Sequence, residues 1–137
     1  MTVFTKQEEL QTETFEWGSI KWGVTPDTFP GAPLTAGEVV INPTKGHAIH
    51  THPDSDEVLY IIEGSGVQTV GDSGEFEVSA GDTIYIPRGT EHSTFNTGWR
   101  QMRILAIYTP GGSEQGLREA PDYVAVPAGQ APVWERA

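Results

Sequence analysis

The stretch His47-Ala-Ile-His50-Thr-His52 holds three of the four histidines in the 137-residue chain, and Glu57 follows soon after it. Side chains alternate between the two faces of a β-strand, so His50 and His52 point the same way and can hold one ion between them. The turn-forming tetrapeptide Pro53-Asp-Ser-Asp56 reverses the chain, so Glu57 begins the next strand and its carboxylate reaches back to the same point. Two imidazoles and one carboxylate suit a divalent ion of Mn, Fe, Co, Ni, Cu or Zn.

The fourth histidine lies in a second stretch, Gly81-Asp-Thr-Ile-Tyr-Ile-Pro87-Arg-Gly89-Thr-Glu-His92-Ser-Thr-Phe-Asn96. Pro87-Arg-Gly89 predicts a type II-like turn, and His92, Thr94 and Asn96 alternate along the strand that follows it. Throughout the chain, short segments rich in Val, Ile, Thr, Tyr and Trp are separated by Gly and Pro turns, which favours an antiparallel sandwich or barrel. The predicted strands span residues 15–17, 20–24, 36–42, 48–52, 57–63, 66–70, 74–78, 83–86, 92–96 and 102–108.

Other local patterns are weaker. Gly71-Asp-Ser-Gly74 predicts a hairpin, residues 5–13 predict a short polar helix or an extended arm, and residues 113–119 predict one or two helical turns. Leu59 and Ile61 share the parity of Glu57, so we expect them to line the same, largely apolar cavity. The sequence does not tell which face of residues 102–108 is inside. The aromatic residues expected in the core are Trp17, Trp22, Tyr60, Tyr85 and Trp99.

The two histidine stretches resemble the conserved motifs of the cupin superfamily. His50-Thr-His52, Glu57 and Gly64 match the first motif in order and spacing, and residues 81–96 match the second at Gly81, Pro87, Gly89, His92 and Asn96. The matching region, residues 46–96, is close to two fifths of the chain. The glycine that usually heads the first motif would fall at Thr44, whereas this chain offers Gly46, which indicates a locally altered turn.

This resemblance implies an all-β cupin double-stranded β-helix, a jelly-roll β-barrel, in a single domain of residues 1–137. Residues 1–30 would form an N-terminal arm and edge strands, residues 36–108 the barrel with both motifs, and residues 109–137 a C-terminal tail packed on the barrel or on a partner. It also implies that His92 joins His50, His52 and Glu57 as a ligand of one metal ion with open positions for water or substrate. In some cupins the carboxylate only hydrogen-bonds nearby, and that alternative is open for Glu57.

His47 is predicted to lie outside this ligand set. It precedes His50 by an odd number of residues and therefore points to the other face of a regular strand. A histidine at the rim of the site is the expected outcome, and a role as proton shuttle or substrate contact is the alternative.

A metal site of this kind favours a metal-dependent enzyme acting on a small oxygen-rich organic molecule. The cupin resemblance admits oxygenase, decarboxylase, isomerase, lyase and polyketide cyclase chemistry alike, so it does not choose the reaction. The alternatives are a non-catalytic cupin that binds or senses a small molecule and, less favoured, a germin-like storage protein. No Gly-rich phosphate loop or Ser-His-Asp pattern of recognisable context competes with the metal site.

The charge and composition of the chain limit the kinds of molecule that we expect it to bind. The net charge is −11 and the sequence pI is about 4.6, so we expect no binding to nucleic acid or to an anionic membrane surface. There is no cysteine, which excludes thiolate ligands and disulfides, and no signal peptide or membrane-spanning stretch is recognised, so a cytoplasmic location is expected. The resemblance implies a homodimer, in which residues 15–22 are exchanged between subunits or fold back on their own chain.

Overall fold

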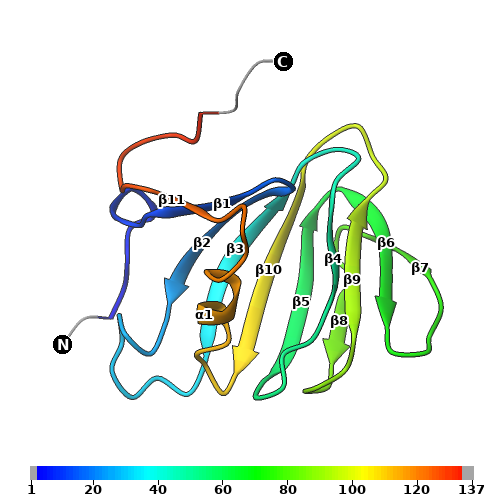
Figure 1. The fold of residues 1–137 in the computed structure, drawn as a ribbon, viewed down its shortest axis with the longest axis horizontal. Coiled ribbons are helices and arrows are strands. Elements are labelled where there is room, and N and C mark those ends of the chain that lie inside the picture. Colours follow the sequence, from blue (N-terminus) through cyan, green and yellow to red (C-terminus); the bar gives the residue numbers. More distant parts are fainter. Residues whose placement is uncertain (1–2, 134–137) are drawn as a thin grey trace.

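The computed structural model describes residues 3–133, which are almost entirely β-strands joined by short turns (Figure 1). The elements in chain order are the 3-10 helix η1 (Gln7–Glu9), β1 (Thr12–Phe15), β2 (Gly18–Val24), β3 (Thr35–Ile41), β4 (Gly46–His50), β5 (Asp56–Glu63), β6 (Ser65–Val70), β7 (Phe76–Ser79), β8 (Thr83–Ile86), β9 (His92–Asn96), β10 (Met102–Thr109), the α-helix α1 (Glu114–Leu117) and β11 (Val124–Val126). The all-β prediction is confirmed. Residues 1–2 of the predicted arm and 134–137 of the predicted tail lie outside the described residues.

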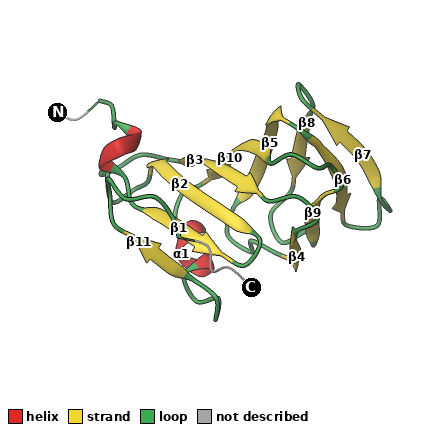
Figure 2. Ribbon diagram, turned by 90° about the horizontal axis from the view of Figure 1, so that it is seen from above, coloured by secondary structure: helices red, strands yellow, loops and turns green. Residues whose placement is uncertain are grey.

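The strands form two antiparallel sheets, as the jelly-roll prediction requires. The larger sheet has the order β11-β1-β2-β3-β10-β5-β8 and the smaller one the order β4-β9-β6-β7. Figure 2 shows that the larger sheet curves, so that β5 and β8 lie beside the smaller sheet while β1 and β11 lie at the far end. Helix α1 lies on the concave side of this curve. The concave side is therefore the place where side chains from both sheets can meet.

The core follows the alternation of side chains along β5 and β10. Leu59 and Ile61 on β5 are buried, and so are Met102, Ile104 and Ala106 on β10, whereas the intervening Leu105 is exposed. The register places Leu59 opposite Ala106, so both strands bury the same face. This pairing settles which face of residues 102–108 is inside.

The two histidine stretches are tied together by their turns. The Thr90 amide donates to the carbonyl of Pro87 at 3.1 Å and Gly89 has a φ of 74°, as expected for the predicted type II-like turn. The Gly89 amide then donates to the carbonyl of His52 at 2.9 Å. Asn96, at the end of the second stretch, donates its side-chain amide to the carbonyls of Ile41 and Arg100. The Gly89 bond holds His52 beside the turn that precedes His92, and the Asn96 bonds fix the other end of β9.

Thr44 occupies the position where the cupin pattern has a glycine. Its φ is 64°, a left-handed conformation that a β-branched residue rarely adopts. Gly46 follows at the start of β4, where an added Cβ would lie 2.6 Å from the carbonyl oxygen of Thr94. The backbone therefore keeps the turn that a glycine would favour, although threonine stands there.

Several sequence expectations are corrected. Tyr60, Tyr85 and Trp99 are exposed, with Tyr60 and Tyr85 on the outer face of the larger sheet, while Trp17 and Trp22 are buried as expected. The sequence predicted buried rings for Tyr60, Tyr85 and Trp99 because it does not show which face of a strand packs against the core. The predicted strand 48–52 ends at His50, and the predicted strand 15–17 is displaced to β1, which leaves Trp17 in a turn. The hairpin at residues 71–74 is confirmed by the antiparallel pairing of β6 with β7, and α1 falls within residues 113–119.

The segments before and after the barrel pair within the same chain. β2 pairs with β3, and β1 lies between β2 and β11. A homodimer stays a prediction. Among the described residues, no helix has both the length and the apolar composition that crossing a membrane would need.

Candidate metal centre

The four predicted ligands come from two sheets. His50 ends β4 and His92 begins β9, and the two residues are directly paired in the smaller sheet. Glu57 lies near the start of β5 in the larger sheet, and His52 lies in the turn between β4 and β5. Because β4 leads into this turn and β5 leaves it, the short connection brings Glu57 of one sheet to the histidines of the other.

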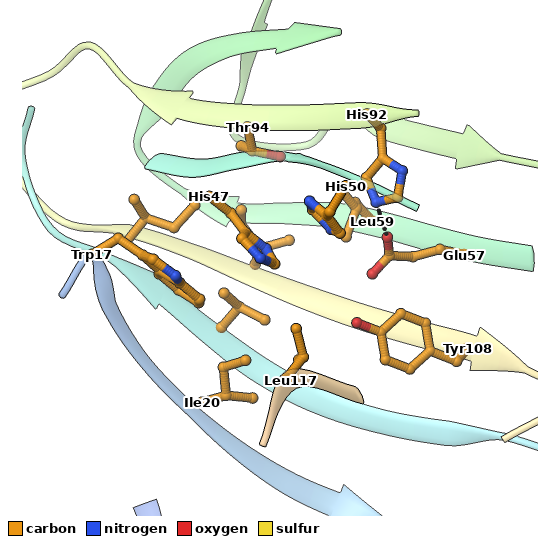
Figure 3. Close-up of a pocket in the computed structure, with 13 residues that line it drawn as sticks. Trp17, Ile20, His47, His50, Glu57, Leu59, His92, Thr94, Tyr108 and Leu117 are labelled. Carbon is orange, nitrogen blue, oxygen red and sulfur yellow. Dashed lines mark ion pairs between the residues drawn. The ribbon is translucent and has the colours of Figure 1, made fainter. Parts of the chain in front are cut away.

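These residues are close enough to hold one ion. Each offers a ligand atom, and the four atoms lie within 4.8 Å of one another. Glu57 Oε1 is 3.0 Å from His92 Nε2 and 3.8 Å from His52 Nε2. Figure 3 shows the Glu57 carboxylate directed at the ring of His92, with the His50 ring beside them. His52, Glu57 and His92 are buried, and His50 is half-buried.

Two of the imidazoles are oriented through their Nδ1 atoms. His50 Nδ1 is 2.7 Å from the carbonyl oxygen of Ala48, and His92 Nδ1 is 2.9 Å from that of Thr90. A carbonyl oxygen only accepts, so each Nδ1 carries the proton and each Nε2 keeps a free lone pair. Hydrogen bonds of this kind commonly set the orientation of metal-binding histidines.

The buried nitrogen atoms point to a ligand. Among the described residues, the Nε2 atoms of His52 and His92 are buried and have no hydrogen-bond partner, although Glu57 Oε1 is near His92 Nε2. A buried polar atom without a partner is costly, because it has lost water and gained nothing in exchange. Three imidazole nitrogens and a carboxylate oxygen directed at one point fit a divalent transition-metal ion.

Burial also keeps the imidazoles of His50 and His52 neutral. It lowers the pKa of His50 to about 2, with the neighbouring His47 and His92 adding to the effect. Burial likewise lowers the pKa of His52, and the Glu57 carboxylate only partly offsets this. The neutral imidazole is the form that binds a metal ion, so the site is ready to bind one at neutral pH.

The placement of His47 differs from the prediction. The pairing of β4 with β9 is irregular between His47 and His50, so strict alternation fails there. As a result the two rings stack with centroids 3.6 Å apart, and Trp17 stacks on the other side of His47 at 5.1 Å. His47 therefore faces the same cavity as His50. Burial lowers the pKa of His47 to about 4.

Tyr108 is a site residue that sequence reasoning missed. It lies on β10 directly opposite Glu57 and is buried, with its ring 4.7 Å from that of His52. In Figure 3 its side chain lies beside Glu57, and its hydroxyl is directed into the cavity. Burial raises the pKa of Tyr108 well above its usual value, and the charge of Glu57 raises it further, so the phenol is protonated at neutral pH. The side-chain alternation along residues 102–108 was visible in the sequence, but its pairing with Glu57 was not.

A cavity of about 40 Å³ adjoins three of the four candidate ligands, His50, Glu57 and His92. His47, His50, Glu57 and His92 contribute to its wall, as does Leu59, which the parity argument placed there. Most of the remaining wall is apolar. It is formed by Ile20, Val39, Ile41, Ile104 and Leu117, together with Trp17.

Comparison with known proteins identifies the fold family. A family model described as the cupin domain matches residues 37–108, more than half of the chain. This chain belongs to the cupin family. Among curated proteins, it is 36% identical over 90 residues to the uncharacterized protein MJ1618 of Methanocaldococcus jannaschii, covering 66% of this chain and 71% of that protein. It is 29% identical to the tetracenomycin polyketide synthase protein TcmJ of Streptomyces glaucescens, covering 68% of this chain and 62% of that protein.

A solved cupin structure supports the same assignment. The oxalate decarboxylase of Lactobacillus farciminis, in a formate complex, superimposes with a TM-score of 0.68 and 27% identity. The match covers 75% of this chain but 32% of the decarboxylase, so the present cupin spans about a third of that enzyme.

Proposed function

We propose that this cupin is a metal-dependent enzyme. His50, His52, Glu57 and His92 would hold one divalent transition-metal ion, of Mn, Fe, Ni, Co, Cu or Zn, and a small organic molecule would bind at its open positions. The observation that carries the proposal is the convergence of the four donor atoms within 4.8 Å, with two buried Nε2 atoms that have no other partner.

Each side chain has a distinct task in this proposal. The bound ion would act as a Lewis acid on a coordinated oxygen atom. The Glu57 carboxylate reduces the positive charge of the centre, and the buried Tyr108, paired opposite Glu57 on β10, packs beside it. The apolar wall excludes water from the reacting molecule. His47, held neutral and directed into the cavity, is placed to contact the substrate or to accept a proton from it.

Oxygenase, decarboxylase, isomerase and cyclase chemistry all use such a centre. Two relatives support this range: one is an oxalate decarboxylase and another is a polyketide synthase protein. Both are longer than this chain, so their activities are not transferred to it.

Metal analysis of the purified protein tests the proposal. We expect about one equivalent of a transition metal in protein purified without added metal, and its loss in His50→Ala because an imidazole ligand is removed. Ile49→Ala is the matched control, since the neighbouring Ile49 side chain is 65% exposed and lies outside the site. Circular dichroism checks that both variants fold.

A wild-type protein that binds no transition metal would contradict the proposal. Dioxygen uptake and product analysis over a panel of small carbonyl compounds then separate oxygenase from isomerase or cyclase chemistry. Tight binding without turnover of any of them would favour the alternative, a cupin that binds or senses a small molecule.

A further inference from the structure

We propose that the cavity selects a small, singly charged chelator, with oxygen donors at one end and an apolar body at the other, and disfavours dianions such as oxalate. This inference rests on the proposed function, because the metal ion would hold the oxygen end. It concerns how the residues of the cavity wall change the affinity of the protein for molecules that chelate a divalent ion equally well.

The wall opposite the ligands offers little to a second polar group. Ile41, Ile104 and Leu117 face the cavity with hydrocarbon surface. Thr94 also lines it, but its hydroxyl donates to Gln68 Oε1 at 2.5 Å and is already engaged. A carboxylate pushed against this wall would lose its water and find few donors, which costs several kcal/mol for an ion.

No cation compensates for that cost. Among the described residues that line the cavity, none is lysine or arginine. Arg118 follows the lining residue Leu117, but its Nε atom is 2.8 Å from Glu13 Oε1. Lys45 precedes β4, and its Nζ atom is 2.6 Å from Glu16 Oε1. Arg103, next to the lining residue Ile104, is paired with Glu38 and Glu63. Lys21, next to the lining residue Ile20, donates to the backbone carbonyls of Gln7 and Leu10. The cations that neighbour the lining residues in sequence are thus engaged elsewhere.

The fixed charges of the site leave room for one negative charge. A divalent ion with Glu57 carries a net charge of about +1 when its three imidazole ligands are neutral. A further carboxylate, Glu114, is buried on α1, where the Thr35 hydroxyl donates to it at 2.6 Å. No lysine or arginine of the described residues pairs with Glu114 in an ion pair. A monoanion therefore neutralises the centre, whereas a dianion adds an unbalanced charge.

The size of the cavity agrees with a small ligand. Its volume of about 40 Å³ is on the order of what three water-sized groups occupy. A chelating head on the ion and a body of a few heavy atoms fit this space.

Pyruvate and oxalate form a matched pair of probes. Both chelate a metal ion through oxygen atoms on two adjacent carbon atoms, and they are similar in size. They differ in that a methyl group of pyruvate replaces a charged oxygen of oxalate. We would load the wild-type protein with Co²⁺ and follow the binding of each probe by the visible absorption of the ion, checking metal content after gel filtration. The affinities are divided by those of each probe for free Co²⁺ in the same buffer.

After this normalisation, we expect the protein to favour pyruvate over oxalate by at least about tenfold, because like charges placed close together repel each other. Leu117→Lys places a cation at the cavity wall and should move the ratio toward oxalate by a similar factor. Leu105→Lys, on the outer face of β10, adds the same charge away from the cavity and should leave the ratio unchanged.

The outcomes separate the two proposals. If the wild-type protein binds Co²⁺ but favours oxalate after normalisation, the selection proposed here is overturned and the metal centre stands. If it binds no Co²⁺, the metal centre itself is overturned, and the inference falls with it. The wild-type comparison decides the matter even if Leu117→Lys does not fold.

Discussion

At the scale of single residues, the contacts of a side chain decide its role more than its spacing does. Trp17, His47 and His50 form one aromatic stack that runs from a turn to a candidate metal ligand. His47 therefore supports the ring of a ligand on one side and faces the cavity on another. Spacing alone had placed it away from the site.

Replacing His47 with Phe separates these two roles. His47→Phe keeps an aromatic ring in the stack but removes both ring nitrogens. We expect unchanged metal content and about fivefold weaker pyruvate binding to the Co²⁺-loaded protein, the effect of one lost hydrogen bond. Metal analysis checks the metal content, and the absorption titration checks the affinity for pyruvate. Loss of the metal would show instead that His47 serves the ion directly.

At the scale of elements, the turn before β4 sets where the first histidine stretch begins. Thr44 holds a φ of 64° and donates its amide to the carbonyl of Asn96 at 3.1 Å, so this turn is anchored to the end of β9. Since β4 pairs with β9 at both ends, from Gly46 to His50, with an irregularity between His47 and His50, the turn contributes to the placement of His50 and His92.

Thr44→Gly should stabilise the protein. A left-handed conformation costs a non-glycine residue about 1–2 kcal/mol, and the greater freedom of glycine in the unfolded chain takes back about 0.5–1 kcal/mol. We expect the free energy of unfolding in urea to rise by about 0.5–1 kcal/mol. Thr97→Gly is the control, because Thr97 is exposed and does not have a positive φ, and it should lower stability. A loss of stability in Thr44→Gly equal to that in the control would mean that the left-handed threonine is not strained.

At the scale of the whole molecule, the buried histidines couple folding to pH. The pKa of His47 is lowered to about 4 and that of His50 to about 2, whereas both are near 6.5 in the unfolded chain. The unfolded chain therefore binds more protons than the folded one below pH 6.5, and acid shifts the balance toward unfolding. The stability that the neutral histidines contribute is complete above pH 6.5 and is lost as the pH falls toward 4 and below.

Urea denaturation of the metal-free protein between pH 7 and 4.5 checks this sign. We expect the free energy of unfolding to fall steadily below about pH 6.5, and to fall less steeply in His50→Ala, which lacks one of the titrating groups. Ile49→Ala should follow the wild-type curve. Parallel curves for the wild type and His50→Ala would show that His50 does not resist protonation in the folded protein.

Much of the fold could be predicted from the sequence, because its signals are local. Alternating residues in short strands, glycine turns at 71–74 and 87–89, and the order of the two histidine stretches required only neighbouring residues. The same spacing singled out His50, His52, Glu57 and His92, and the structure brings these four together. The exposed Tyr60 and Tyr85 were misjudged because both faces of their strands carry apolar residues.

The sequence by itself determined an all-β cupin and the four side chains that could form a metal centre. Only the tertiary structure decided that His47 faces the cavity, that Tyr108 lies opposite Glu57, and that α1 closes the wall with Leu117. These features depend on an irregular strand pairing and on contacts between residues far apart in the chain. The alternation of side chains along one strand does not show which strand lies opposite it. The charge and size of the cavity are therefore defined only when both sheets are assembled.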